Sequence, residues 1–256
     1  MILAIDVGNT NIVIGTYSDH KLCFVARIRT APEKTEDEYG VLIRSILRLH
    51  HQDPAELTGV IISAVVPQLM ATMKKSAMLL NPKARILALG PGVKTGLDIK
   101  IDNPAQLGAD LVATAIGTIE KYPLPAIILD LGTATKICVV DKNRSFRGCS
   151  ILPGIKIALE ALSSRTAQLP AISLEGEDIK ILGTNTLDSM RSGVILGGAS
   201  MLDGMIDRME AEYGPFATVV ACGGLVSSIV PHCRRSITVD PNLLLDGLYA
   251  IYRKNS

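Results

Sequence analysis

The chain has 256 residues, of which 48% are hydrophobic and 20% are charged, a composition typical of a soluble globular enzyme with a sizeable core. Its net charge of +1, from 26 basic and 25 acidic residues, favours neither nucleic acid nor a membrane surface as a partner. No apolar run reaches the ~18 residues of a membrane span, and Asp6 comes too early for a signal peptide, so we expect a cytoplasmic protein.

The first half of the chain is predicted to alternate strands and helices. Residues 2–17 have the pattern of an apolar strand, a turn rich in Gly and Asn, and a second apolar strand. Thr35 and Glu38 have the spacing of a capping box, and they begin a segment at 35–51 with one apolar helical face. Three further elements are expected in order: a buried strand at 59–65, a helix from Pro67 to about residue 80, and a strand at 84–90.

The second half is predicted to begin in the same way and to end in helices. Asn103 and Pro104 form a helix-start signal, and the helix is expected to reach Lys121. Four further elements are expected: a strand, turn and strand at 126–141, a mostly helical stretch from Gly154 to about residue 212 with breaks near Leu169 and Gly183, a strand at 217–225, and a helix from about Asn242 to Tyr252.

The motif Asp-x-Gly occurs twice, each time at the end of a buried strand. LAIDVGNTN at 3–11 and IILDLGTAT at 127–135 are related by a constant offset, since 130 − 6 = 124. A motif that recurs after about half the chain suggests gene duplication and two similar α/β halves. Because Pro123-Leu124-Pro125 is a credible boundary, we expect domains at 1–122 and 123–256.

The chemistry of this motif suits a polyphosphate. The glycine permits a tight turn whose backbone amides approach an anion closely, and Asn9, Thr10 and Asn11 add side-chain donors. The aspartate would repel a phosphate directly but would hold a metal ion or its water. The first turn has no lysine and no Gly-x-x-x-x-Gly-Lys, so it is not a P-loop. Two such hairpins predict a nucleotide cleft between the halves, with Mg²⁺ and amides neutralising the phosphates.

Eight segments in order resemble the type III pantothenate kinases over essentially the whole chain. They are DVGNTN at 6–11, KTEDEYG at 34–40, ISAVVP at 62–67, GPGVKTGLDIKIDNPAQLGAD at 90–110, DLGTAT at 130–135, LPGI at 152–155, GTNTLDSMRSG at 183–193 and CGGL at 222–225. The resemblance implies a duplicated actin-like (ribonuclease H-like) α/β fold of the sugar-kinase and heat-shock ATPase superfamily. It also implies a homodimer that phosphorylates pantothenate with ATP and Mg²⁺, the first step towards coenzyme A.

The resemblance also implies roles for individual residues. Asp110 matches the general base, and Asp130 matches the ligand of a monovalent cation, K⁺ or NH₄⁺. Gly108 and Ala109 match substrate-binding positions beside that base, and Thr186 matches a pantothenate contact at the dimer interface. The matched ATP-binding positions are Asp6 (also near Mg²⁺), Val7, Gly8, Asn9, Thr10, Asn11, Ile12, Val13, Gly132 and Thr133.

Three positions depart from the family's pattern. The family usually has arginine after the GAD segment and tyrosine before DNP, where this chain has Leu111 and Ile101. Both changes replace polar substrate contacts with aliphatic side chains. Lys136 stands where threonine is common, and it could supply positive charge near the phosphates.

Other functions on the same fold remain open at this point. One is a nucleotide-binding regulator that has lost kinase activity, which Leu111 and Ile101 favour. Others are a filament-forming ATPase, a sugar kinase, an acetate kinase, and a kinase that acts on a different small molecule with a hydroxyl group. The retention of Asp6, Asp110 and Asp130 favours an active pantothenate kinase, because a binding module needs no general base.

Overall fold

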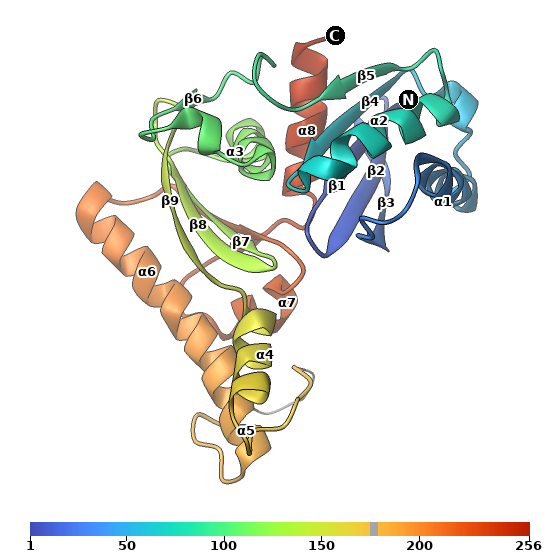
Figure 1. Cartoon of the computed structure of the whole chain (residues 1–256). Coiled ribbons are helices and arrows are strands. Elements are labelled where there is room, and N and C mark those ends of the chain that lie inside the picture. The colour runs from blue at the N-terminus through green and yellow to red at the C-terminus, as the bar shows by residue number, and fades with distance from the viewer. Residues whose placement is uncertain (175–178) are drawn as a thin grey trace. The chain divides into compact units, whose positions relative to one another are not determined.

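A computed structural model describes residues 1–174 and 179–256 (Figure 1). The chain divides into two compact units, each built on one β-sheet. The first unit comprises Met1–Leu97, Asp102–Glu120 and Asn242–Ser256, and the second comprises Asp98–Ile101 and Lys121–Pro241. Within the described residues, no helix has both the length and the apolar character needed to cross a membrane.

The sheet of the first unit has five strands in the order β3-β2-β1-β4-β5. These are β1 (Ile2–Val7), β2 (Asn11–Ser18), β3 (Lys21–Arg29), β4 (Gly59–Ala64) and β5 (Arg85–Ala88). Strands β1, β2 and β3 form an antiparallel meander, whereas β4 and β5 run parallel to β1. The central strands β1 and β4 are almost entirely buried, so their apolar runs contribute side chains to both faces of the sheet.

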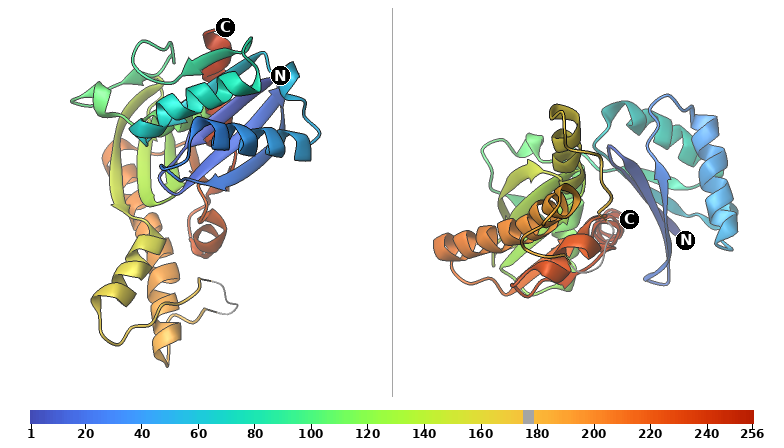
Figure 2. Two further views of the ribbon diagram at one scale, coloured as in Figure 1. Left: turned by 45° about the vertical axis from the view of Figure 1, so that its right-hand side comes forward. Right: turned by 90° about the horizontal axis from the view of Figure 1, so that it is seen from below.

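Helices cover both faces of this first sheet (Figure 2). The helical elements of the first unit are α1 (Glu36–Leu49), η1 (Pro54–Glu56), α2 (Pro67–Leu80), η2 (Pro104–Gln106), α3 (Ala109–Lys121) and α8 (Leu243–Lys254). The predicted capping box begins α1: the Thr35 hydroxyl accepts from the Glu38 N–H at 3.3 Å, and the Glu38 carboxylate accepts from the Thr35 N–H at 2.8 Å. Helices α1 and α2 pack on one face, and α8 packs on the other against β1 and β4.

The sheet of the second unit has six strands in the order β11-β10-β7-β8-β9-β6. The elements are β6 (Asp98–Ile99), β7 (Ala126–Leu131), β8 (Ala134–Val140), β9 (Ser145–Pro153), α4 (Ile155–Arg165), α5 (Thr186–Arg191), the π-helical turn η3 (Ser192–Leu196), α6 (Gly197–Tyr213), β10 (Thr218–Cys222), α7 (Val226–Ile229), η4 (Val230–His232) and β11 (Thr238–Val239). The core joins Ile127 and Leu129 of β7 to Leu202 and Ile206 of α6. Helices α5, η3 and α6 follow one another without a break, and α4 lies beside them (Figure 1).

The two sheets repeat the same order of strands, as the duplicated motif predicts. In each unit an antiparallel meander, β1-β2-β3 or β7-β8-β9, is followed by a strand parallel to its first member, β4 or β10. Asp6 and Asp130 occupy the same position in this repeat, one residue before the end of the first strand. The predicted α/β architecture with two similar sheets is therefore confirmed.

The two units differ from the expected halves 1–122 and 123–256 at the C-terminus. The last stretch, Asn242–Ser256, belongs to the first unit because α8 packs against β1, β4 and α3. Two glycines allow the close approach of α8 to α3. A Cβ on Gly117 would lie 2.1 Å from the Leu243 carbonyl oxygen, and a Cβ on Gly247 would lie 1.8 Å from the Ala113 carbonyl oxygen.

Several predicted boundaries need correction. The helix expected from Pro104 to Lys121 is two elements, because the Asn103 side chain caps only the short turn η2 and α3 begins at Ala109. No helix forms in the described residues between Arg165 and Thr186, where a mostly helical stretch was expected. The meander strands β3 and β9 had no prediction from the sequence.

Candidate functional site

The first Asp-x-Gly turn is shaped by hydrogen bonds from its own unit. Its Gly8 N–H donates to the Asn11 carbonyl oxygen at 3.0 Å, and a Cβ at Gly8 would lie 2.9 Å from that oxygen. Thr30 of the neighbouring segment donates from its hydroxyl to the Gly8 carbonyl at 2.7 Å and from its N–H to the Thr10 carbonyl at 3.0 Å. The turn is thus fixed while Asn9, Thr10 and Asn11 are exposed to solvent.

The predicted ATP-binding residues of this turn differ in what they can offer. Val7 and Ile12 are fully buried in the core, so only their backbone groups could contact a ligand. Asp6 is buried, with an exposed fraction of 8%, and lies between Val13 of β2 and Ser63 of β4 in the sheet register. The buried Ser63 hydroxyl oxygen has no hydrogen-bond partner among the described residues. A carboxylate and a hydroxyl therefore lie side by side at the carboxyl end of two parallel strands.

This pair fits the divalent cation expected near Asp6. Mg²⁺ takes oxygen ligands, usually one or two carboxylates, while water and substrate phosphates complete its coordination. Within the described residues, no three His, Cys, Asp or Glu side chains converge to hold a metal ion on their own. A Mg²⁺ ion at Asp6 would consequently need phosphate oxygens, as an ion that arrives with a nucleotide does.

The second turn, Gly132-Thr133, is one residue shorter and is packed between two other backbone segments. A Cβ on Gly154 would lie 2.0 Å from the Thr133 carbonyl oxygen. Gly223, whose φ of +104° suits glycine, would place a Cβ 2.6 Å from the Leu131 carbonyl oxygen. These two glycines belong to the LPGI and CGGL segments, so that pair of segments supports the second turn from either side.

Asp130 precedes this turn and contacts a lysine. Asp130 and Lys136 are direct cross-strand partners of β7 and β8, and the Lys136 Nζ lies 2.8 Å from the Asp130 Oδ2. The two side chains have exposed fractions of only 16% and 21%. On the other side of Asp130, the parallel strand β10 places the buried Cys222. The carboxylate expected to bind a monovalent cation is thus paired with an ammonium group of the chain itself.

Two cysteines lie on the same face of β8 and β9 as Lys136. Cys138 and Cys149 are cross-strand partners, and their sulfur atoms are 3.0 Å apart. The Cys138 thiol donates to Cys149, and this hydrogen bond lowers the pKa of Cys149, with a smaller contribution from the Lys136 ammonium. The same hydrogen bond and burial raise the pKa of Cys138.

The predicted base, Asp110, lies in the first turn of α3 and is half-buried. Its Oδ1 accepts from the Leu111 N–H at 2.9 Å, and a Cβ on Gly108 would lie 2.4 Å from that same oxygen. Glycine at 108 thus leaves room for the carboxylate to fold back over the start of the helix. The Asp110 carbonyl oxygen accepts from the Thr114 hydroxyl at 2.7 Å, which anchors the first turn of α3.

The residues that depart from the family's pattern have different surroundings. Leu111 follows Asp110 on α3 and is buried, with an exposed fraction of 7%. Ile101 is half-buried in the segment after β6. Neither position offers a polar group to a substrate.

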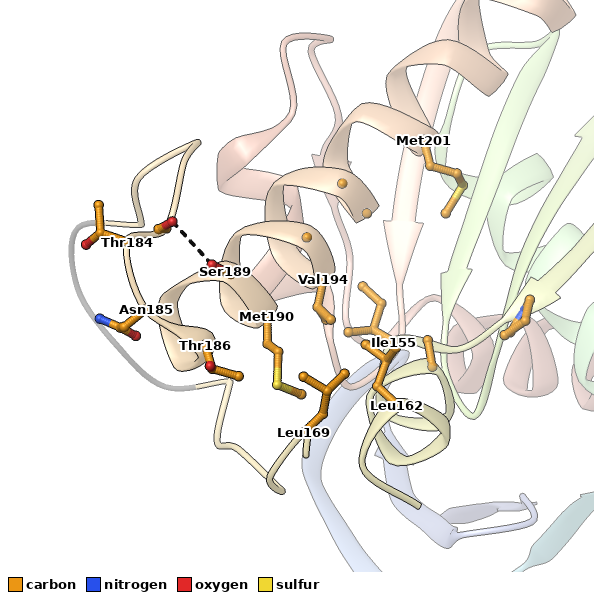
Figure 3. Close-up of a pocket in the computed structure, with 16 residues that line it drawn as sticks. Ile155, Leu162, Leu169, Thr184, Asn185, Thr186, Ser189, Met190, Val194 and Met201 are labelled. Atoms are coloured by element: carbon orange, nitrogen blue, oxygen red, sulfur yellow. Dashed lines mark hydrogen bonds between the residues drawn. The ribbon is translucent and has the colours of Figure 1, made fainter. Parts of the chain in front are cut away.

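Thr186 lines a cavity of about 950 Å³ in the second unit (Figure 3). It is the first residue of α5 and is exposed, and the Asn185 side chain caps the helix by accepting from the Asp188 N–H at 2.9 Å. The Ser189 hydroxyl donates to the Gly183 carbonyl at 3.2 Å and holds the GTNT segment against the helix. The rest of the lining is largely apolar and includes Ile155, Leu162, Leu169, Met190, Val194 and Met201.

A second cavity, of about 810 Å³, had no prediction from the sequence. Its lining includes Lys156, Leu159, Glu160 and Ser163 of α4, the loop residues Ala171, Ile172, Ser173, Leu174 and Ile179, together with Ile195, Leu225, Ser227, Ser228, Pro231 and His232. The Leu225 N–H donates to the Leu131 carbonyl oxygen at 3.3 Å, which joins one lining residue to the end of β7, just before the second turn. Leu225 belongs to the CGGL segment, in which Gly223 closely approaches the backbone of Leu131.

Comparisons with known proteins agree on one family. A family model described as type III pantothenate kinase matches residues 2–208. A type III pantothenate kinase from Halalkalibacterium halodurans is 41% identical over 258 residues, covering 100% of both chains. One from an Exiguobacterium species is 44% identical over 256 residues, covering 100% of this chain and 99% of the relative.

Solved structures extend the likeness to the fold. A Campylobacter jejuni protein described as a Baf family transcriptional activator has a TM-score of 0.61 at 17% identity, covering 99% of this chain and 98% of that chain. The activator of 2-hydroxyisocaproyl-CoA dehydratase from Clostridium difficile, solved with bound ADPNP, has a TM-score of 0.56 at 13% identity, covering 99% and 95%. At such identities the likeness shows the shared actin-like fold alone.

Proposed function

The chain belongs to the type III pantothenate kinase family, and we propose that it transfers the γ-phosphate of ATP to the primary hydroxyl of pantothenate. The observation that carries the proposal is the pair of Asp-x-Gly turns at matching positions of the two sheets. Phosphoryl transfer is mainly a matter of positioning and charge neutralisation. The turns supply backbone amides for the phosphates and carboxylates for cations, which is what this reaction requires.

The phosphates of ATP are expected to contact the exposed side of both turns. In the first turn, Asn9, Thr10 and Asn11 are exposed and can donate from backbone and side chain. In the second, Gly132 and Thr133 are held by the close backbone contacts of Gly154 and Gly223. A turn that is already fixed loses little conformational freedom when it binds an anion.

Asp6 and the adjacent Ser63 hydroxyl are the groups that we assign to Mg²⁺. When bound, Mg²⁺ neutralises the negative charge that builds up on the transferred phosphoryl group. The assignment explains why a carboxylate is buried beside a turn that must attract phosphates. It also accounts for a buried hydroxyl that has no partner among the described residues.

Asp110 is the group that we assign as general base. A carboxylate within hydrogen-bond reach of the pantothenate hydroxyl accepts its proton as the oxygen attacks the γ-phosphorus. The leaving group is ADP, and the product is 4′-phosphopantothenate. One carboxylate oxygen accepts from the Leu111 N–H, and this hydrogen bond orients the group at the start of α3.

The second cavity is the region that we assign to the nucleoside of ATP. One of its lining residues, Leu225, is hydrogen-bonded to Leu131, the last residue before the second turn, and the lining has both apolar and hydroxyl groups. A purine ring requires apolar surfaces for its faces and a few polar groups at its edge. Leu159 and Leu225 provide the first, and Ser163, Ser227 and Ser228 provide the second.

We further propose that Thr186 contacts pantothenate and that the working form is a homodimer. The exposed Thr186 lies at the wall of an apolar cavity, and several large apolar side chains around that region face solvent: Ile157, Leu162, Ile181, Leu182 and Leu187. Exposed apolar surface of this kind is typical of protein interfaces. A second copy of the chain would cover it.

The reaction is tested by coupled measurement of ADP release, with and without pantothenate, in wild type and in Asp110→Asn. We expect pantothenate-dependent turnover in the wild type. In Asp110→Asn we expect a loss of roughly 10²- to 10⁴-fold, because a positioned general base contributes that much. Binding of an ATP analogue should be retained in the variant.

The matched control is Asp37→Asn, since Asp37 is likewise in the first turn of a helix but is exposed on α1. It should keep wild-type turnover. Turnover in Asp110→Asn above about a tenth of wild type would remove Asp110 from the role of base. No pantothenate-dependent turnover in the wild type would favour the regulator, and turnover with a sugar or acetate instead would change the substrate.

A further inference from the structure

The pairing of Asp130 with Lys136 bears on the cation requirement of the proposed kinase. Their position as direct partners in the β7–β8 ladder places both side chains on one face of the sheet. The 2.8 Å separation of Nζ and Oδ2 is that of a charge-assisted hydrogen bond. Both side chains are largely buried, so salt in solution screens this pair only weakly.

The residues at this position do not fit an added monovalent cation. The resemblance to the family implies K⁺ or NH₄⁺ at Asp130, and such an ion would need the same carboxylate that Lys136 already contacts. It would also lie beside the Lys136 ammonium, and like charges a few ångströms apart in a half-buried position repel strongly. The ammonium of Lys136 has the charge and the hydrogen-bonding groups of NH₄⁺, and it is attached to the chain.

The first unit provides an internal comparison. In the sheet register, the position equivalent to Lys136 is Val13, which lies directly across from Asp6. The strand on the other side of Asp6 contributes a serine, whereas Asp130 has Cys222 there. The two aspartates therefore occupy equivalent positions, but only Asp130 has a lysine as its cross-strand partner.

A cation beside Asp130 has a clear physical task. A Cβ on Gly132 would lie 3.4 Å from the Asp130 Oδ1, so the carboxylate is next to the backbone of the second turn. An uncompensated carboxylate there would repel the phosphates that the turn is proposed to bind. A positive charge beside Asp130 offsets that repulsion at the second turn.

We propose that the Lys136 ammonium takes the place of the monovalent cation beside Asp130, so that this enzyme binds ATP and turns over without K⁺ or NH₄⁺. Lys136 is thus a positioning residue for the second phosphate turn. The proposal rests on the proposed function, because it assumes that the turn binds the phosphates of ATP.

The test compares wild type with Lys136→Thr in choline chloride and in potassium chloride at equal ionic strength. Calorimetric titration with a non-hydrolysable ATP analogue and Mg²⁺ is the first readout, and pantothenate-dependent ADP release is the second. In wild type, affinity and rate should change by less than about twofold between the two salts. In Lys136→Thr, loss of a charge-assisted contact should lower both in choline by roughly 10- to 150-fold, and K⁺ or NH₄⁺ should restore them.

Two controls separate the possible causes of a loss. Lys142→Thr removes an exposed lysine just beyond the end of β8 and should leave both readouts unchanged. Lys136→Arg keeps the charge and should stay independent of K⁺. Thermal unfolding of each variant identifies a loss that comes from misfolding, and the response of Lys136→Thr to K⁺ is a readout that a merely structural role would not give.

Either of two results would overturn the proposal. One is activation of the wild type by K⁺ of more than about tenfold in analogue binding or rate. The other is a Lys136→Thr variant that matches wild type in choline. If pantothenate turnover is absent from the wild type in every salt, the proposed substrate fails, while analogue binding still decides the role of Lys136.

Discussion

At the scale of single residues, the role of a carboxylate in this protein depends on its partners across the sheet. Asp6 and Asp130 hold the same position in two similar sheets, and the motif around them is almost the same. Asp6 has a valine and a serine beside it, whereas Asp130 has a lysine and a cysteine. We propose that the serine beside Asp6 adds an oxygen ligand for Mg²⁺ and that the lysine beside Asp130 replaces an external cation. On these proposals, one duplicated motif serves two functions.

Leu111 allows a prediction about the position where the family usually has arginine. Because Leu111 is buried, we expect Leu111→Arg to place a charge in a buried position. A buried charge without a partner costs roughly 3–5 kcal/mol, so the free energy of unfolding should fall by about that amount. Urea denaturation measures this, provided that the slope of the transition stays constant.

The matched control is Leu111→Met, which conserves volume and should cost less than about 1.5 kcal/mol. The KM for pantothenate tests the alternative that an arginine at 111 contacts the substrate. If Leu111→Arg is as stable as wild type and also lowers the KM for pantothenate, then an arginine at 111 reaches the substrate. In that case position 111 would tolerate a long polar side chain, even though the shorter leucine is buried there.

At the scale of elements, the contact between α3 and α8 positions the proposed base. Gly247 lies against the Ala113 carbonyl, and there is no room for a methyl group at that contact. We therefore expect Gly247→Ala to push α8 away from α3 and to lower the free energy of unfolding by roughly 1–3 kcal/mol. Because Asp110 is in the first turn of α3, turnover should fall as well.

The control for this substitution is Gly204→Ala in the interior of α6, where an added Cβ meets no atom within 4 Å. Alanine is the better helix former by roughly 0.5–1 kcal/mol, so this variant should be more stable than wild type. Chemical denaturation of both variants gives the comparison. Equal stability of the two would show that α3 and α8 adapt to each other easily.

Much of the element order could be predicted from the sequence, and the omissions have physical causes. Strands β1, β4 and β7 are buried apolar runs, and the capping residues Thr35 and Glu38 indicated the start of α1. Strands β3 and β9 are outer members of their meanders and are half-exposed. The sequence of β9 is mixed, whereas β3 contains an apolar run at 22–26 that the prediction from the sequence overlooked. The place of α8 in the first unit depends on close glycine contacts with a helix far away in the sequence.

The candidate site could be predicted in part. The two turns were identified because Asp-x-Gly recurs at a constant offset, and the backbone contacts of Gly8, Gly132 and Gly223 agree with their tight geometry. The Lys136–Asp130 pair could not be predicted, because it requires the strand register and not only the spacing. The cavity beside α4 joins segments about 60 residues apart, from Ser163 to Ser228, which a pattern along the chain does not bring together.

At the scale of the whole molecule, neither unit is a single continuous segment. The first unit takes its last helix from the C-terminal end of the chain, and the second takes β6 from the segment before α3. A fragment that ends at Lys121 would lack α8, whose side chains and backbone fill the space between α3 and the first sheet. We therefore expect the first unit to be complete only when the whole chain is present.

The final prediction concerns assembly. Exposed apolar side chains on α4 and α5 are unfavourable in water, so we expect a second copy of the chain to bury them. Leu162 and Leu187 are 38% and 45% exposed there, and Leu162 also lines the cavity that contains Thr186. Sedimentation velocity of the wild type should give about twice the chain mass of 27.3 kDa. Leu162→Glu should shift the protein to a monomer, since a charge at a packed interface is costly when unpaired. It should also raise the KM for pantothenate.

Leu49→Glu, at a 75% exposed leucine of α1, should remain a dimer with unchanged kinetics. A wild type that sediments as a monomer at micromolar concentration, yet turns over pantothenate, would show that one copy of the chain suffices.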